Sequence, residues 1–202
     1  MIATTAVSQR APTGYRMDST ESVRSGVDQR PFALLILVLC FVTNALSAQQ
    51  PLEYDVKAAY LLNFTKFIEW PESAFADERS PFVICILGHD PFGRVLDNIV
   101  HEESVDHRRV VVRRIIDIPA PQTCQMVFVE SASQELTKRL AAAARGMLTI
   151  GQGTPFVLDG GMIAFVVEDR KVRFDINQTA AENAGLKVSS KLLKVARTVV
   201  RE

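Results

Sequence analysis

The chain has 202 residues, of which 48% are hydrophobic, and its 23 Lys and Arg are balanced by 23 Asp and Glu. That length is typical of one domain, and the hydrophobic fraction is enough for a sizeable core. A neutral charge balance excludes the basic footprint of a nucleic-acid-binding protein and the polybasic patch of a protein that binds anionic membranes. We therefore expect neither nucleic acid nor a membrane surface as a partner.

Residues 1–48 have the pattern of a secretory signal peptide. Arginines precede an eleven-residue apolar run, FALLILVLCFV, and small residues follow that run up to Ala48. This order is typical of a cleaved leader, whereas a permanent membrane anchor needs about 20 apolar residues. Because the polar region before the run is long, Met17 is an alternative start. We expect cleavage near Ala48 and an exported domain over residues 49–202.

The first folded stretch, YDVKAAYLLNFTKFIEWP at 54–71, is rich in aromatic residues. Its apolar positions recur with helical spacing, and Pro71 disfavours helix at the residue before it, so we predict a helix that ends at Trp70. Either this is simply a core helix, or some of its aromatic side chains face a partner or ligand. The candidates are Tyr54, Tyr60, Phe64, Phe67 and Trp70.

Short apolar runs then alternate with helical patterns. Such runs are typical of strands buried on both faces, and the alternation predicts a largely parallel sheet. We expect strands at 82–87, 109–116, 125–129 and 147–150, and helices at 92–100 and 134–144.

The last third has a different pattern. Residues 162–167 and 171–176 form a predicted antiparallel hairpin, because the second run alternates strictly between apolar and charged residues. A short helix up to Asn183 and a terminal helix with a stripe reaching Val199 follow. The sequence thus predicts a single-domain α/β sandwich with a mostly parallel central sheet, a C-terminal antiparallel hairpin and helices on both faces.

Motifs of catalysis are missing from the sequence. No serine lies in a Gly-x-Ser-x-Gly frame, and the pair Gly151 and Gly153 lacks the third glycine of a dinucleotide fingerprint. His89, His101 and His107 lack metal-ligand spacing. We therefore expect no enzyme, cofactor or metal site, and a hydrolase is the least favoured class.

One short motif is a candidate binding site. The segment GHDPFG at 88–93 follows a predicted buried strand and opens a predicted helix, a place where α/β proteins bind ligands. Asp90 as a cap and Pro91 as the first helical residue would also explain the motif as a turn. The candidate ligand or partner residues here are Gly88, His89, Asp90 and Phe92.

Two cysteines, Cys85 and Cys124, follow the predicted leader. In an exported protein such a pair is a disulfide candidate. Two buried free thiols are the alternative.

Taken together, the segments resemble the YfiR family, also described as domain of unknown function 4154. The likeness lies in AAYLLNFTKFIEWP at 58–71, ILGHDPFG at 86–93, and the stretch 147–196 with its GGMI, RFDIN and AGLKVSSKLLKVA segments.

The resemblance implies an exported α/β sandwich that often dimerises, so we expect a homodimer. The best-known members are periplasmic repressors of an inner-membrane diguanylate cyclase, and an OmpA-like outer-membrane lipoprotein relieves the repression by sequestering the repressor. Cys85 and Cys124 match one disulfide of the family; a second is absent here, because no cysteine follows Cys124.

We therefore expect a periplasmic, non-enzymatic regulatory protein that binds and represses an inner-membrane signalling partner, such as a diguanylate cyclase. The alternative is a periplasmic small-molecule binding module, with its pocket near residues 88–93 and the aromatic helix.

Overall fold

A computed structural model describes residues 49–201, so the predicted signal peptide at 1–48 lies outside the described residues. The helices are α2 (Gln49–Phe64), α3 (Arg94–Val100), α4 (Gln134–Ala143), α5 (Thr154–Leu158), α6 (Gln178–Asn183) and α7 (Ser190–Val195), with a 3₁₀ turn, η1, at Glu72–Ala74. The strands are β1 (Ile68–Glu69), β2 (Phe82–Leu87), β3 (Ser104–Val105), β4 (Arg108–Ile115), β5 (Met126–Val129), β6 (Leu148–Gln152), β7 (Ile163–Glu168), β8 (Lys171–Asn177), β9 (Lys187–Val188) and β10 (Thr198–Val200).

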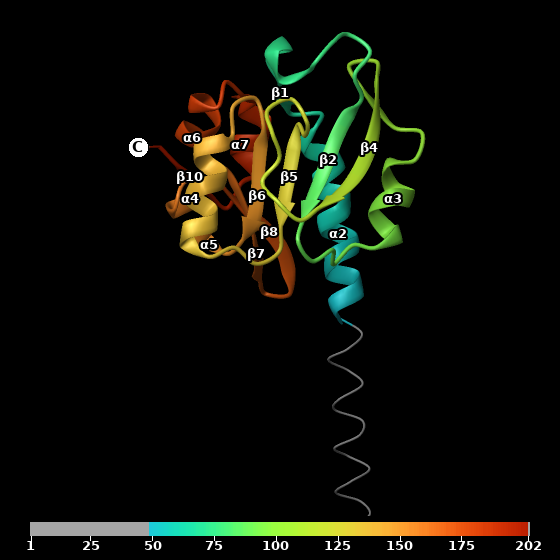
Figure 1. The fold of residues 1–202 in the computed structure, drawn as a ribbon. Coiled ribbons are helices and arrows are strands. Elements are labelled where there is room, and N and C mark those ends of the chain that lie inside the picture. The colour runs from blue at the N-terminus through green and yellow to red at the C-terminus, as the bar shows by residue number, and fades with distance from the viewer. Residues whose placement is uncertain (1–48, 202) are drawn as a thin grey trace, which may run out of the picture. The chain divides into compact units, whose positions relative to one another are not determined.

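One eight-stranded sheet organises the domain, in the order β10-β8-β7-β6-β5-β2-β4-β3. Neighbouring strands are parallel except at the β7–β8 hairpin and at β3–β4. Figure 1 shows α2 behind this sheet and α4 in front of it. The predicted sandwich, with its mostly parallel sheet, C-terminal hairpin and helices on both faces, is confirmed.

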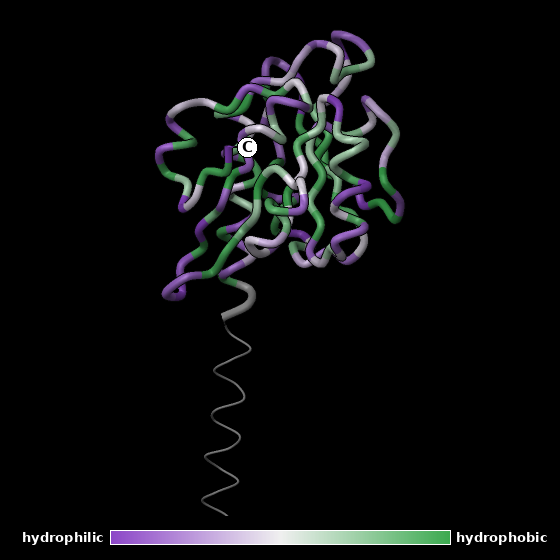
Figure 2. Tube along the Cα trace, turned by 90° about the vertical axis from the view of Figure 1, so that its left-hand side faces the viewer, coloured by the Kyte–Doolittle hydropathy of each residue, from purple (hydrophilic) through white to green (hydrophobic). Residues whose placement is uncertain are grey.

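The central strands are hydrophobic on both faces because both faces are covered. All six residues of β2 and all four of β5 are buried. Figure 2 shows hydrophobic residues concentrated along the strands and hydrophilic ones at the outer turns. This burial is the main stabilising contribution to the fold.

The helix α2 packs an aromatic cluster against the hairpin. The ring of Phe64, which is fully buried, lies 5.9 Å from that of Phe165 and 5.2 Å from that of Phe174. Tyr60 joins the same cluster, with its ring 5.5 Å from that of Phe174. Aromatic pairs at these separations stabilise a core beyond their buried area.

The prediction that this helix continues to Trp70 was wrong, because it ends at Phe64. The backbone N–H of Thr65 bonds to the carbonyl of Leu62, and the Thr65 hydroxyl donates to the same carbonyl, at 2.6 Å. The chain then enters β1, which pairs with β9 in a separate two-stranded sheet. A tertiary partner for β1 therefore overrides the helical spacing.

The C-terminal helix is also shorter than predicted. It ends at Val195, and Val199 belongs to β10, which pairs in parallel with β8. Arg197 fixes this segment, since its guanidinium donates to both carboxylate oxygens of the buried Asp175, at 2.8 and 2.5 Å. That ion pair holds the start of β10 against β8, at the edge of the sheet.

Side chains cap three of the helices, and one helix begins later than predicted. Ser133, Asn177 and Ser189 accept the capping hydrogen bonds of α4, α6 and α7. The helix predicted from residue 92 begins instead at Arg94, because Asp90 accepts from the N–H groups of Phe92 and Gly93 and closes a turn.

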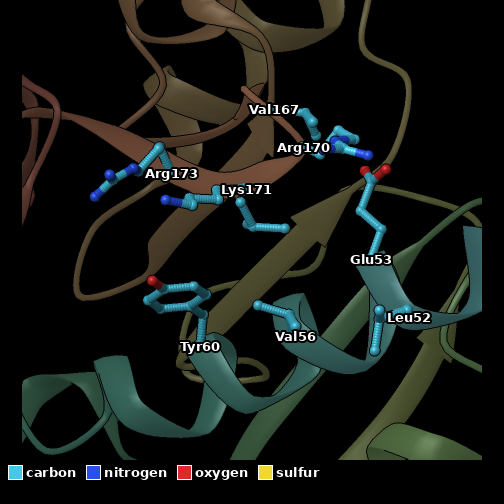
Figure 3. Close-up of a pocket in the computed structure, with 9 residues that line it drawn as sticks. Leu52, Glu53, Val56, Tyr60, Val167, Arg170, Lys171 and Arg173 are labelled. Atoms are coloured by element: carbon cyan, nitrogen blue, oxygen red, sulfur yellow. The ribbon is translucent and has the colours of Figure 1, made fainter. Parts of the chain in front are cut away.

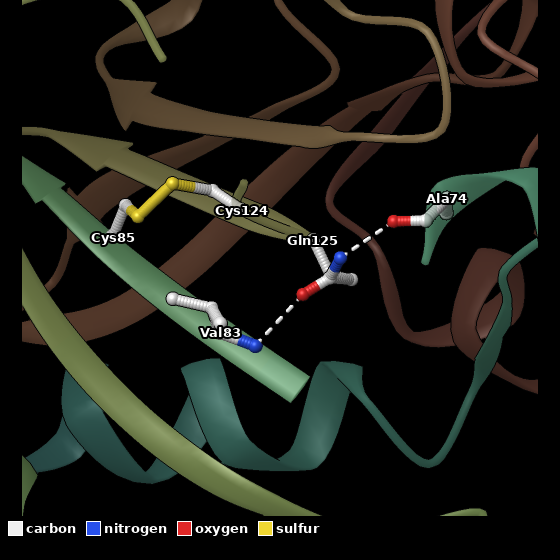
Figure 4. The surroundings of a disulfide bond; sticks show 5 residues. All are labelled: Ala74, Val83, Cys85, Cys124 and Gln125. Carbon is white, nitrogen blue, oxygen red and sulfur yellow. Dashed lines mark hydrogen bonds between the residues drawn. A yellow bond between two sulfur atoms is a disulfide. The ribbon is translucent and has the colours of Figure 1, made fainter. Parts of the chain in front are cut away.

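A disulfide joins Cys85 on β2 to Cys124 just before β5, with 5.9 Å between the Cα atoms. The candidate pairing is confirmed, and the alternative of free thiols is wrong. Beside it, the buried Gln125 side chain accepts from the N–H of Val83 and donates to the carbonyl of Ala74, as Figure 4 shows. Covalent and polar bonds therefore fix β2 against the start of β5.

Candidate binding surfaces

The first candidate surface is a crevice at the carboxyl ends of the central strands. After β2 the chain adds β4 on one side, then returns to add β5 and β6 on the other. In parallel α/β sheets, ligands bind where the strand order reverses in this way. The crevice has a volume of about 250 Å³ and is lined by Leu87, Gly88, His89, Ile116, Asp117, Ile118, Val129, Glu130, Ser131, Leu136 and Arg139.

Glu130, which follows β5, links two segments that sequence reasoning singled out separately. Its Oε1 accepts a 2.6 Å hydrogen bond from the Tyr54 hydroxyl, and its Oε2 lies 2.5 Å from Nδ1 of His89. The Tyr54 ring also packs edge-on against Phe92, at 5.6 Å. The aromatic helix and the GHDPFG segment thus meet at one carboxylate.

These contacts change the acidity of both partners. Although its partial burial acts in the opposite direction, hydrogen bonds from Tyr54 and His89 hold the pKa of Glu130 below its usual value. Burial and the neighbouring Glu130 carboxylate raise the pKa of Tyr54 above its ordinary range. Glu130 is therefore an anion, and Tyr54 a neutral donor, over the physiological pH range.

The polar network continues into the domain through Lys57, whose side chain is almost completely buried. Its ammonium donates to Oε1 of Gln152, at 2.8 Å, and forms an ion pair with Glu53. The amide of Gln152 in turn donates to the Tyr54 hydroxyl, at 3.3 Å. A buried lysine is tolerated only when it is paired in this way.

The second candidate surface is a groove between the start of α2 and the β7–β8 hairpin, with a volume of about 660 Å³ (Figure 3). Its lining residues are Leu52, Glu53, Val56, Tyr60, Val167, Arg170, Lys171, Val172 and Arg173. Leu52 is 67% exposed and Val167 is 50% exposed, which is unusual for large apolar side chains on opposite walls of one hollow.

The rim of this groove is basic. Arg170, Lys171 and Arg173 are exposed, and none of them forms an ion pair within residues 49–201. Asp169 and Arg170 both have positive φ, at 50° and 60°, which matches the two-residue turn that suits a hairpin. The hairpin therefore presents cations beside an apolar hollow.

The candidate residues from the sequence fall into three environments. Gly88 and His89 line the crevice, and Tyr60 lines the groove. Tyr54 bonds to Glu130 of the crevice, and Phe92 packs against Tyr54. The others serve the fold: Phe64 is buried, and the Trp70 indole donates to the carbonyl of Gln125.

Two further candidates also have structural partners. Phe67 is half-buried, and its carbonyl accepts from the N–H of Ser189. Asp90 pairs with Arg114, with 2.9 Å between Nε and Oδ2. Which of the candidates contact a partner stays a prediction.

Several residues of these surfaces escaped sequence reasoning. Glu130 and Gln152 gave no motif, since each is far in sequence from the residues it contacts. The hairpin cations gave none because charges that alternate with apolar residues indicate only an exposed strand face. Lys57 did leave a signal, because it is the single cation among the mostly apolar residues 56–65.

Within residues 49–201, no group of three His, Cys, Asp or Glu side chains is arranged to hold a metal ion. No helix in that same part of the chain is long and apolar enough to cross a membrane.

The chain was compared with solved structures, with curated proteins and with models of protein families. A solved structure described as an ABC domain in complex with L-Trp, from Streptococcus pneumonia, has 11% sequence identity and a TM-score of 0.42. The match covers 63% of this chain and 57% of that one, and at this similarity it carries no argument. No curated protein matches the chain.

The sequence model of the YfiR/HmsC-like family, DUF4154, matches residues 54–197, nearly all of the described domain. At the level of the family, this match supports a regulatory rather than a catalytic role, in cyclic-di-GMP signalling in the periplasm. The chain belongs to the YfiR/HmsC-like family.

Proposed function

We propose that the mature domain is a non-enzymatic periplasmic regulator that binds and represses an inner-membrane signalling protein, a diguanylate cyclase. The observation that carries this proposal is the family match over residues 54–197. The confirmed disulfide supports it, because disulfides persist in oxidising compartments such as the periplasm.

Recognition without catalysis needs an exposed apolar patch with polar groups around it. The groove between α2 and the hairpin supplies Leu52, Val56 and Val167, with the hairpin cations at its rim. Repression then follows from differential affinity: the domain binds the inactive conformation of the cyclase's periplasmic region more tightly than the active one. To hold a fully active cyclase at about 1% of its output, the two affinities must differ by about 10⁴-fold.

The test is cyclic-di-GMP synthesis by a full-length membrane cyclase, reconstituted so that its periplasmic region is accessible to added mature domain. We expect saturable inhibition. The control is the same domain after heat denaturation, first checked for loss of folded signal. Complex formation without any change in synthesis would contradict repression.

Two further assemblies belong to the same proposal. An OmpA-like outer-membrane lipoprotein would compete with the cyclase for the domain and restore synthesis, and the domain would form a homodimer. Light scattering coupled to size-exclusion chromatography tests the dimer, and adding the purified lipoprotein to the inhibited cyclase tests the competition.

A second candidate function is binding of a small molecule in the crevice. The observation that favours it is the position of His89 and Glu130 at the point where the strand order reverses. A metabolite that raises the melting temperature of the wild type, but not of Glu130→Gln, would support this function. The absence of any shift across a broad metabolite panel counts against it.

A further inference from the structure

The β7–β8 hairpin leaves half of one strand edge unpaired. β10 pairs with β8 only at Asp175, Ile176 and Asn177. Within residues 49–201, no strand pairs with the outer edge of residues 171–173. That free half-edge belongs to the same residues that line the groove against α2 (Figure 3).

The register of the hairpin shows which backbone groups are free. Glu168 pairs with Lys171 across the two-residue turn, so this pair exchanges the ladder hydrogen bonds. The N–H and C=O of the next residue, Val172, therefore point outward. Consistently, the carbonyl of Phe174, two residues on, accepts from the N–H of Arg197, at 2.8 Å. Val172 thus offers one donor and one acceptor to an added strand.

Side chains around this edge alternate in character. Val172 is half-buried against the core and lines the groove, where Val56 and Tyr60 on α2 form the other wall. Lys171 and Arg173 flank it as exposed cations (Figure 3). The single acid in the lining, Glu53, is already paired with Lys57. The edge therefore has an apolar centre between exposed cations that form no ion pair within residues 49–201, although Glu168 lies opposite Lys171 on β7.

From this arrangement we infer that a partner's extended segment, with acidic and apolar residues in alternation, adds as a strand beside Val172. Its backbone would bond to Val172, its apolar side chains would enter the groove, and its carboxylates would lie beside Lys171 and Arg173. This inference rests on the proposed function and names the chemistry of the partner's contact.

A second copy of the chain fits this edge poorly. In an antiparallel pairing centred on Val172, Lys171 of each copy would lie opposite Arg173 of the other. Like charges directly opposite each other destabilise a sheet pair, and exposed cations commonly protect edge strands from self-association. The charges thus favour an acidic partner over a homodimer at this edge.

The probe is a fluorescein-labelled heptapeptide that alternates glutamate and valine, titrated into the mature domain by fluorescence anisotropy. We expect saturable binding that weakens with salt, and no binding of the same peptide with lysine in place of glutamate. Equal binding of the two peptides, or none of either, would overturn the inference.

Two variants test the cations and the backbone N–H of Val172 separately, and a third is a control. Reversing both cations, Lys171→Glu with Arg173→Glu, should weaken binding of the glutamate peptide at least about tenfold, since attraction becomes repulsion at two positions. Lys138→Glu, an exposed charge change on α4, should leave it unchanged. Val172→Pro removes the outward N–H without removing a ladder bond to β7, and should abolish binding.

If Val172→Pro fails to fold, a peptide N-methylated at alternate positions replaces it, and the wild-type domain should not bind this peptide. Undiminished binding would overturn strand addition. A dimer that depends on Val172 would assign the edge to self-association instead.

Failure of this inference is distinguishable from failure of the proposed function. Variants that lose the peptide but still repress the cyclase would leave repression standing and remove the edge from it. If the wild type binds the peptide but does not repress the cyclase, strand addition at this edge would stand and the proposed repression would fail.

Discussion

The hydroxyl of Tyr54, on the first turns of α2, donates a 2.6 Å hydrogen bond to Glu130, which lies 76 residues further along the chain at the end of β5. The same carboxylate contacts His89, so one anion joins the helix to the loop after β2. Through Gln152 and Lys57 the network reaches Glu53 at the rim of the groove. The two candidate surfaces therefore share one set of polar side chains.

Removing the Tyr54 hydroxyl should weaken the domain. We expect Tyr54→Phe to lower the free energy of unfolding by about 1–2 kcal/mol, because the bond is made to a charged acceptor. Tyr60→Phe is the matched control: its hydroxyl makes no hydrogen bond within the described residues, so its effect should stay within about 0.5 kcal/mol. Equal effects in urea unfolding would show that the Tyr54–Glu130 bond contributes nothing.

Glu130 should make stability depend on acid pH. Its folded-state pKa lies below the ordinary value of 4.5, so the unfolded chain binds its proton first as the pH falls. The stabilisation is complete above pH 4.5 and is lost as the pH falls through the folded-state pKa. Unfolding measured from pH 7 to pH 3 should therefore show a steeper loss for the wild type than for Glu130→Gln. Parallel curves would contradict this.

Reduction of the disulfide should cost much of the stability. Closing the 39-residue separation between Cys85 and Cys124 stabilises by about 4 kcal/mol on the chain-entropy model. We expect a drop of that order on adding reductant, and none in the double alanine variant. Thiol titration of the denatured, unreduced domain should find no free cysteine.

Substitutions of core and of surface residues of α2 should have very different effects on the free energy of unfolding. Phe64→Ala should lower the free energy of unfolding by about 3–5 kcal/mol, because it opens a cavity in the aromatic cluster. Leu52→Ala, at a side chain that is 67% exposed, should change it by no more than about 0.5 kcal/mol. It should instead weaken binding of the glutamate peptide.

The core was predictable because its signals are local. The run FVICIL at 82–87 has the same limits as the observed strand β2, and the hairpin strands predicted at 162–167 and 171–176 lie within one residue of β7 and β8. Two-residue strands such as β1 and β9 are defined by each other rather than by their own composition. That is why the helix was predicted too long.

The polar network could not be predicted from sequence. Lys57 and Gln152 are 95 residues apart, and nothing in their surroundings in the chain indicates the contact. The resemblance identified the family, while the meeting of the aromatic helix with the GHDPFG segment at Glu130 needed the three-dimensional arrangement.

The central claim is repression of a membrane diguanylate cyclase by binding outside the membrane. The most direct measurement is the rate of cyclic-di-GMP synthesis by the full-length cyclase as purified mature domain is titrated onto its periplasmic side. We expect synthesis to fall to a low plateau as the complex saturates. A rate that stays constant through saturation would contradict the account.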